Sequence, residues 1–263
     1  MERIAFSVLL ITAFMAALLM PSPVKAYFNV TYLNTTVFLN KNTSAYVVET
    51  LTLYVSNSSI NQYILDTRAI NLTLSDWQNA INTNLLVEHI LNPKSNLYDF
   101  KFSPGALAVY GNYGYAQLEM SYYVANVTTV KNIGPRKFEY TFDDNVFNFQ
   151  HSASGQILPQ NAQLNMIVPK GAQIVNVYPP PNLPNKFGIL VNYTNVTKLS
   201  WYSGEPLSSF NFTFIITESP GQEVFNFFNR IYTQYEYLIY AVVILVIILI
   251  ISYLYIKTTH PKV

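Results

Sequence analysis

The feature that most constrains this chain is an uncharged apolar run near its C-terminal end, Leu238–Ile256. Fourteen of its nineteen residues are Ile, Leu or Val, and Ser252 is the one small polar residue. As a helix with about 1.5 Å of rise per residue it covers roughly 28 Å, close to the ~30 Å hydrocarbon core of a bilayer. We therefore expect a transmembrane helix over 238–256, with membrane lipid as its partner.

A second apolar run, Ile4–Met20, lies between a short charged start and a Pro-containing segment that ends at Ala26. This order is typical of a secretory signal peptide, which predicts that residues 1–26 are removed. The alternative is an uncleaved N-terminal anchor, because the apolar run is long. Lys257 and Lys262 follow the C-terminal run, and positive charge favours the cytoplasmic side. The expected topology is a single-pass cell-membrane protein with its N-terminal ectodomain outside and a cytoplasmic tail over 257–263.

The predicted ectodomain carries almost no net charge. Between Tyr27 and Thr233 there are eleven Lys and Arg against twelve Asp and Glu, a net charge of −1. Nucleic-acid binding needs a basic surface, and this balance offers none. We therefore expect no nucleic acid among the partners.

Cysteine is absent from the chain, and asparagine is abundant. Without cysteine there can be no disulfide, thiolate nucleophile or cysteine-ligated metal, and this favours a prokaryotic envelope over a eukaryotic secreted protein. Nine Asn-x-Ser/Thr sequons occur, about twice the number that chance predicts for this composition. The predicted N-glycosylation sites are Asn29, Asn34, Asn42, Asn57, Asn71, Asn126, Asn192, Asn195 and Asn211.

Short alternating segments predict that the ectodomain is mainly β. A hairpin is expected over 28–39 and 45–55, because Lys41–Ser44 supplies turn residues and the second segment alternates strictly. Gly and Pro separate the other candidates. The remaining expected strands are 98–102, 107–110, 113–124, 137–142, 163–168, 173–177, 188–193, 198–202 and 209–216. This spacing predicts an antiparallel β-sandwich.

One packed helix is expected near 75–91, before Asn92-Pro93 stops it. Ser75 is its expected N-cap, and Trp77, Ile81, Leu85, Leu86 and Ile90 form an apolar stripe at helical spacing. The polar, Gly-Pro-terminated segment 126–135 is expected to be a connection between two lobes. The predicted organisation is an N-terminal lobe over 27–132 and a second lobe over 133–221.

Two ionisable residues interrupt these patterns. Glu49 has the same parity as the apolar residues of its strand, so it is expected either at a sheet edge or beside a partner. His89 lies near the end of the expected helix, where a surface or capping role is favoured over a ligand role.

The residues that carry chemistry are sparse. The chain has three histidines, and His260 lies in the expected cytoplasmic tail, so a three-His zinc site is excluded from the ectodomain. The most suggestive group is Asp143, Asp144 and His151, with Glu139 nearby in sequence. Sequence proximity does not make a catalytic triad, and Asp143-Asp144-Asn145 lacks the Gly and Glu of a calcium loop. We expect no enzyme activity, catalytic residue, cofactor or metal.

Aromatic residues precede the predicted span at helical spacing: Phe225, Phe228, Tyr232 and Tyr235. We expect a juxtamembrane aromatic helix over 222–237 that continues into the span. Tyr253 and Tyr255 would form the aromatic belt on the inner side. Interfacial anchoring explains this pattern, and a contact with the helix of another membrane protein is the alternative.

Two segments carry a resemblance, Ser44–Leu53 and Leu158–Ala172, together with Pro179-Pro180-Pro181 and Trp201. In them the chain resembles archaeal, crenarchaeal-like single-pass surface proteins. That resemblance implies a signal peptide, a β-sandwich ectodomain and one C-terminal transmembrane helix, and it implies no activity.

Three functions follow as hypotheses. The first is a membrane-anchored, N-glycosylated surface protein with a structural or interaction role in the envelope. The second is an accessory subunit of a membrane complex, held through its transmembrane helix. The third is an envelope glycan or peptide hydrolase.

Overall fold

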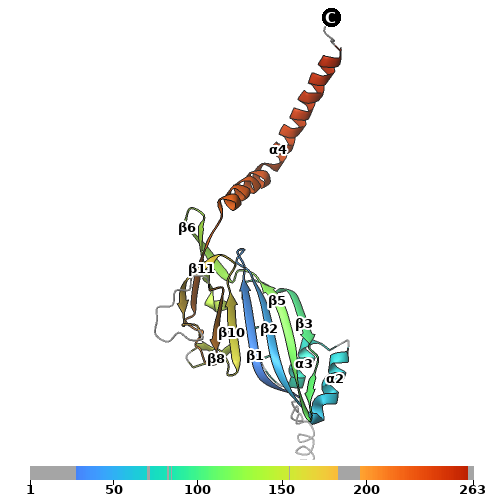
Figure 1. Ribbon diagram of the computed structural model, residues 1–263, viewed down its shortest axis with the longest axis vertical. Helices are drawn as coiled ribbons and strands as arrows, with labels where there is room; N and C mark the ends of the chain where they lie inside the picture. The colour runs from blue at the N-terminus through green and yellow to red at the C-terminus, as the bar shows by residue number, and fades with distance from the viewer. Residues whose placement is uncertain are drawn as a thin grey trace, which may run out of the picture. The chain divides into compact units, whose positions relative to one another are not determined.

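The computed structural model describes residues 28–69, 72–81, 83, 85–153, 155–182 and 196–259 (Figure 1). The expected signal peptide, the sequons at Asn71, Asn192 and Asn195, and the strand expected over 188–193 lie outside these residues. The chain forms two compact units. One contains the residues up to Val130 together with Tyr140–Phe214, and the other contains Lys131–Glu139 and Ile215–Val263.

The predicted hairpin is confirmed. Strand β1 (Phe28–Leu39) pairs antiparallel with β2 (Ala45–Ser56), and every second residue of β2 is buried. Turn residues between them and the strict alternation of β2 specify both the turn and the register. Strand β5 (Tyr113–Val124) covers the other side of β2 along its whole length, so β2 lies inside the sheet.

The larger sheet is mixed, and the expectation of purely antiparallel pairing was wrong for one pair. Its order is β12-β10-β1-β2-β5-β3, with the short β4 (Ala108–Tyr110) beside β5. Strand β10 (Ala162–Ile167) runs parallel to β1, while β12 (Lys198–Tyr202) and β3 (Tyr98–Pro104) pair antiparallel with their neighbours. A parallel pair needs a long connection, and more than a hundred residues separate β1 from β10.

Two helices follow β2 and the short 3₁₀ turn η1 (Asn57–Ser59), where one was expected. Helix α2 (Ile60–Arg68) was not predicted, and α3 (Leu74–Ile81) ends well before residue 91. Thr73 caps α3 in place of Ser75. Its hydroxyl accepts from the Asp76 backbone N–H, and Asp76 Oδ2 accepts from the Thr73 backbone N–H at 2.7 Å, which is a reciprocal capping box. Poor helix formers follow Ile81 in the sequence, Asn82-Thr83-Asn84, and they favour its end there.

Helices α2 and α3 lie beside β3 (Figure 1), and aromatic side chains attach both of them to the large sheet. The rings of Tyr63 in α2 and Trp77 in α3 meet edge-on at 5.5 Å, and Tyr63 also contacts Phe28 of β1 at 5.4 Å. Trp77 reaches Phe102 of β3. Tyr63 and Trp77 are buried, so these contacts close one end of the hydrophobic core.

A smaller sheet has the order β11-β13-β7-β6. The segment expected as a connection over 126–135 is strand β6 (Thr128–Gly134), which differs from the expectation. The other strands are β7 (Lys137–Phe142), β11 (Ala172–Tyr178) and β13 (Asn211–Thr217), and a separate short hairpin joins β8 (Gln150–Ser152) to β9 (Gly155–Ile157). Within the first unit, Trp201 of β12 packs edge-on against Phe212 of β13, so side chains of the two sheets meet in the core.

The C-terminal helix α4 (Pro220–Thr259) departs from helical geometry at Tyr235, where φ is −123°. Among the described residues, none of the helices by itself combines the length and hydropathy that crossing a membrane requires. Two segments, Phe227–Tyr235 and Tyr240–Ser252, meet that requirement only as a pair, and they are bent by 82°.

Candidate functional site

A fully buried carboxylate lies at the centre of the larger sheet. Glu49 is 0% exposed on β2, and both of its carboxylate oxygens have partners. Oε1 accepts from the backbone N–H of His89 at 2.8 Å and from the hydroxyl of Tyr122, while Oε2 lies 2.5 Å from His89 Nδ1. Of the two sequence expectations for Glu49, the paired one is confirmed.

His89 is buried, so the expectation of a surface or capping histidine was wrong. Its side chain is 2% exposed, and its ring stacks on Phe149 with the centroids 4.8 Å apart. The backbone around it pairs with another segment: Asn148 N–H donates to His89 O at 2.8 Å, and Leu91 N–H donates to Val146 O at 2.7 Å. This pairing, and not a helix, holds His89 above Glu49.

Tyr122 of β5 completes the group that we call the Glu49 cluster: Glu49, His89 and Tyr122. Its hydroxyl donates to Glu49 and accepts from the Ile90 backbone N–H at 3.2 Å. Burial, followed by the adjacent charge of Glu49, raises the pKa of the Tyr122 phenol well above its ordinary value. Tyr122 therefore stays a neutral hydrogen-bond donor to the carboxylate at physiological pH.

A cavity of about 280 Å³ lies beside this cluster and is lined by both His89 and Phe149. Nδ1 of His89 is engaged by Glu49, whereas no described residue hydrogen-bonds to Nε2. Among the described residues, the polar side-chain atoms that are buried without a partner are Thr35 Oγ1 and Thr128 Oγ1. Nε2 is not one of them, so it keeps some contact with solvent. Nε2 is thus the ring nitrogen that solvent can reach. A histidine oriented by a carboxylate, with its other nitrogen accessible, can accept or donate one hydrogen bond or proton.

The sequence group around His151 is brought together only in part. Asp144 and His151 line a second cavity of about 230 Å³ with Asn145 and Ser208. Asp143 instead caps the 3₁₀ turn η2 (Asp144–Val146), accepting from the Asn145 backbone N–H at 3.1 Å, which fits the expected turn. Glu139 belongs to the second unit. Within the described part of the chain, no three His, Asp or Glu side chains are grouped closely enough to hold a metal ion.

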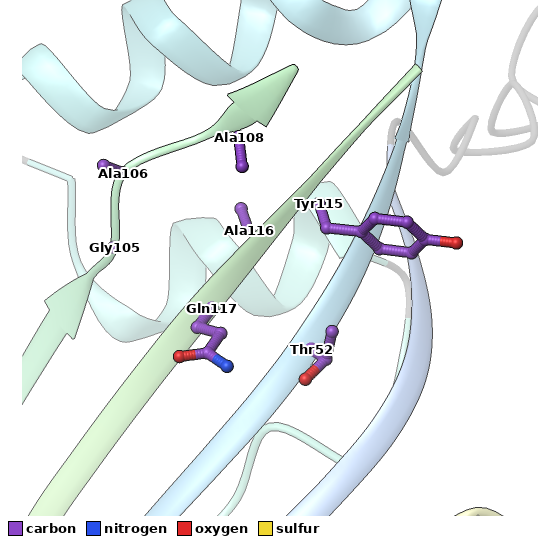
Figure 2. A pocket seen from close by; sticks show the side chains of 7 residues that line it. All are labelled: Thr52, Gly105, Ala106, Ala108, Tyr115, Ala116 and Gln117. Atoms are coloured by element: carbon purple, nitrogen blue, oxygen red, sulfur yellow. The ribbon is translucent and has the colours of Figure 1, made fainter. Parts of the chain in front are cut away.

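A third cavity, of about 260 Å³, lies where the β3–β4 connection meets β5 (Figure 2). Thr52 lines it from β2 and Tyr115 and Gln117 line it from β5, while Gly105 and Ala106 of the connection and Ala108 of β4 leave the space open because they are small. Gly105 is required there, because a Cβ atom would lie 2.8 Å from the carbonyl oxygen of Gln117. With Tyr115 as its one ionisable side chain, this cavity offers hydrogen bonds and little acid–base chemistry.

The described sequons differ in exposure. The exposed asparagines are Asn29, Asn42, Asn57, Asn126 and Asn211. Asn34 is only half-exposed, and its Oδ1 accepts from Asn165 Nδ2 at 2.7 Å. Two sequons already show a contact between the asparagine and the hydroxyl residue: Ser44 Oγ donates to Asn42 Oδ1 at 2.7 Å, and Thr213 Oγ1 donates to Asn211 Oδ1 at 3.2 Å.

Comparison with known proteins leaves the chain unassigned. No protein-family profile matches it, and no curated protein matches it. Among solved structures it is similar to the Fcho1 Mu homology domain of Danio rerio with a bound Eps15 peptide, at 10% identity. That similarity covers 72% of this chain and 77% of the other, with a TM-score of 0.20. A TM-score this low supports no inference about fold or function.

The Glu49 cluster was not predicted as a unit. Glu49 drew attention because it broke the apolar parity of β2, but its partner lies 40 residues away in a segment expected to be helical. The sequence offered one clue to the partner, which is that histidines are few. Apart from His260, only His89 and His151 could be a histidine partner of Glu49.

Proposed function

We propose that this protein is a single-pass, N-glycosylated surface protein whose β-rich ectodomain has a structural or interaction role in the cell envelope. The observation that carries the proposal is the apolar surface of α4. Ten consecutive side chains, from Val242 to Ile251, are each between 46% and 60% exposed. They point in all directions around the helix, so no single protein face would cover them.

A bilayer is the environment that suits such a surface. Apolar area left in water costs roughly 25 cal/mol per Å², and monomeric proteins rarely expose large continuous apolar patches. A hydrocarbon core would cover all sides of the helix together. The sequence run 238–256 supports the same proposal by its length and its lack of charge.

Two further parts of the proposal concern the ectodomain. Contacts between Trp201 and Phe212 support a sandwich in which the two sheets face each other across an aromatic core. Exposed sequons support glycans on the ectodomain surface, and a surface low in charged residues would gain hydration from them.

The second candidate is an accessory subunit of a membrane complex. It is favoured by exposed aromatic side chains at the start of α4, where Phe225, Phe227 and Phe228 are 63%, 59% and 63% exposed. Such residues suit either a membrane interface or a partner helix.

Membrane extraction tests the first candidate. We would express the full chain in a prokaryotic host and wash the membranes with alkaline carbonate. The intact protein should stay in the pellet. A variant with Leu245→Arg, Ile248→Arg and Leu249→Arg should not insert, because each arginine costs about 2.5 to 3.5 kcal/mol at the centre of a span.

The matched control is Leu65→Arg, which charges an exposed apolar residue of α2 outside the proposed span. It should stay in the pellet with the parent protein. Release of the parent chain by carbonate would overturn the proposal, and so would retention in the pellet of a triple variant whose N-terminal sequence shows that residues 1–26 have been removed. Purification in a mild detergent separates the two candidates, since a stoichiometric membrane partner would favour the accessory subunit.

A further inference from the structure

The cavity beside His89 has the features of a small-ligand site. Its volume of about 280 Å³ lies near the lower end of the range for small-molecule sites. It contains a buried, oriented histidine whose Nδ1 is fixed by Glu49 and whose Nε2 reaches solvent. Such a nitrogen offers one directional hydrogen bond to whatever occupies the space.

The rest of the lining is uncharged and combines three amide side chains with four apolar ones, Leu85, Val87, Phe149 and Pro159. Asn148, Gln150 and Gln160 contribute three primary amides, and each amide can both donate and accept. Asn148 Nδ2 is already used, donating to Glu88 O at 2.9 Å, while no described hydrogen bond engages the Gln150 and Gln160 side chains. Pro159 and Phe149 supply apolar surface next to these groups.

The charge balance favours a neutral ligand over an anion. No Lys or Arg lines the cavity, and the nearest charged partner of His89 is the carboxylate of Glu49. A carboxylate or phosphate would therefore find no net positive charge there.

We infer that this cavity binds a neutral, hydroxyl-rich ligand of the size of one sugar residue. Amide side chains match the alternating donors and acceptors of adjacent hydroxyls, and Pro159 provides a surface for the C–H face of the ring. His89 Nε2 would bind one hydroxyl, held in place by Glu49. This inference is independent of the membrane anchor and of the glycosylation state of the chain.

Histidine-selective NMR tests the inference on the full chain in detergent micelles. We would label the histidines with ¹⁵N and assign them with His151→Gln and His260→Gln. Methyl α-glucoside, methyl α-mannoside and methyl β-galactoside would then be added up to about 50 mM, enough to detect a millimolar Kd. At least one of them should shift the His89 Nε2 resonance saturably and leave His151 unchanged.

Two exposed glutamines of the lining can be replaced to weaken ligand binding without altering the buried Glu49 cluster. The double variant Gln150→Ala with Gln160→Ala should raise the Kd by about tenfold, the effect of losing one or two net hydrogen bonds. Gln173→Ala, an exposed glutamine on β11, should leave the Kd unchanged. The fold of each variant is checked by its unshifted His89 resonance before ligand is added.

Three results would overturn the inference. His89 could fail to respond to all three glycosides, it could respond to acetate instead, which would make this an anion site, or the double glutamine variant could bind as tightly as the parent. The membrane extraction described above has no bearing on these outcomes, so the two proposals fail separately.

Discussion

Glu49 Oε1 accepts the backbone N–H of His89 at 2.8 Å, so one carboxylate binds both the main chain and the ring of the same histidine. This double contact ties the segment around His89 to the middle of β2. Because both residues are buried, the link is shielded from salt and water, and removing one partner should cost far more than it would at a surface.

The first prediction concerns this pair. His89→Leu should lower the free energy of unfolding by about 3 to 5 kcal/mol, because Glu49 would be left as a buried charge without its histidine. Glu49→Leu together with His89→Leu should cost clearly less than the sum of the single variants. Denaturant unfolding of the three variants measures this, and strict additivity would show that the two side chains do not interact.

Removal of the Tyr122 hydroxyl gives a second prediction. Tyr122→Phe should cost about 1 to 3 kcal/mol, because Glu49 loses one donor and the Ile90 N–H loses its acceptor in a buried place. Tyr123→Phe is the matched control on the next residue, which is partly exposed, and it should change stability by less than about 0.5 kcal/mol. Equal effects of the two substitutions would contradict this role for the Tyr122 hydroxyl.

Alkaline pH should weaken the fold through Tyr63. Burial raises the pKa of Tyr63 from 10.0 to about 12, so the folded state holds the proton more tightly than the unfolded state. This stabilisation is complete below pH 10 and is lost as the pH rises to about 12. Denaturation midpoints measured over this window should therefore fall with pH.

Tyr63→Phe should make that fall less steep, although it should also cost about 1 kcal/mol at neutral pH by removing the bond to Gly105 O. Tyr110→Phe, at an exposed position, should not alter the slope. An unchanged slope in Tyr63→Phe would assign the alkaline loss to other groups.

Sequon occupancy is a further prediction, and it rests on the proposed glycosylation. Asn29 and Asn34 lie on the same strand, but Asn29 is exposed whereas the amide of Asn34 is hydrogen-bonded to Asn165. Intact glycopeptide mass spectrometry should find a glycan on Asn29 and little on Asn34. Asn165→Ala should raise the occupancy of Asn34, and equal occupancy of both sites in the parent protein would refute the dependence on local structure.

Local patterns predicted much of the fold. The β1–β2 hairpin and β5 follow from alternation and turn residues, which act between neighbours in sequence. The helix near residue 75 was predicted too long for a specific reason. Leu86 and Ile90 are buried as its apolar stripe required, but the backbone from His89 to Leu91 pairs with residues 146–148 and is not helical. Apolar periodicity indicates which side chains are buried. Here it could not distinguish a helix from a non-helical segment that buries the same side chains.

The candidate site and the parallel pair depend on distant contacts. Nothing local indicates that Glu49 meets His89, or that Leu33 of β1 lies beside Ala162 of β10. Parity along β2 did indicate that Glu49 lies either at a sheet edge or beside a partner. The choice among partners depends on the sheet order, which a single sequence does not specify.

The parallel pairing of β1 with β10 also sets the order in which the chain can fold. The β1–β2 hairpin can form once residue 56 has been made. The other edge of β1 cannot pair until residues 162–167 have been made. Contacts this far apart in sequence slow folding, and an unpaired edge invites association with other chains. Until β10 is made, this edge of β1 therefore stays unpaired and open to pairing with a strand of another chain.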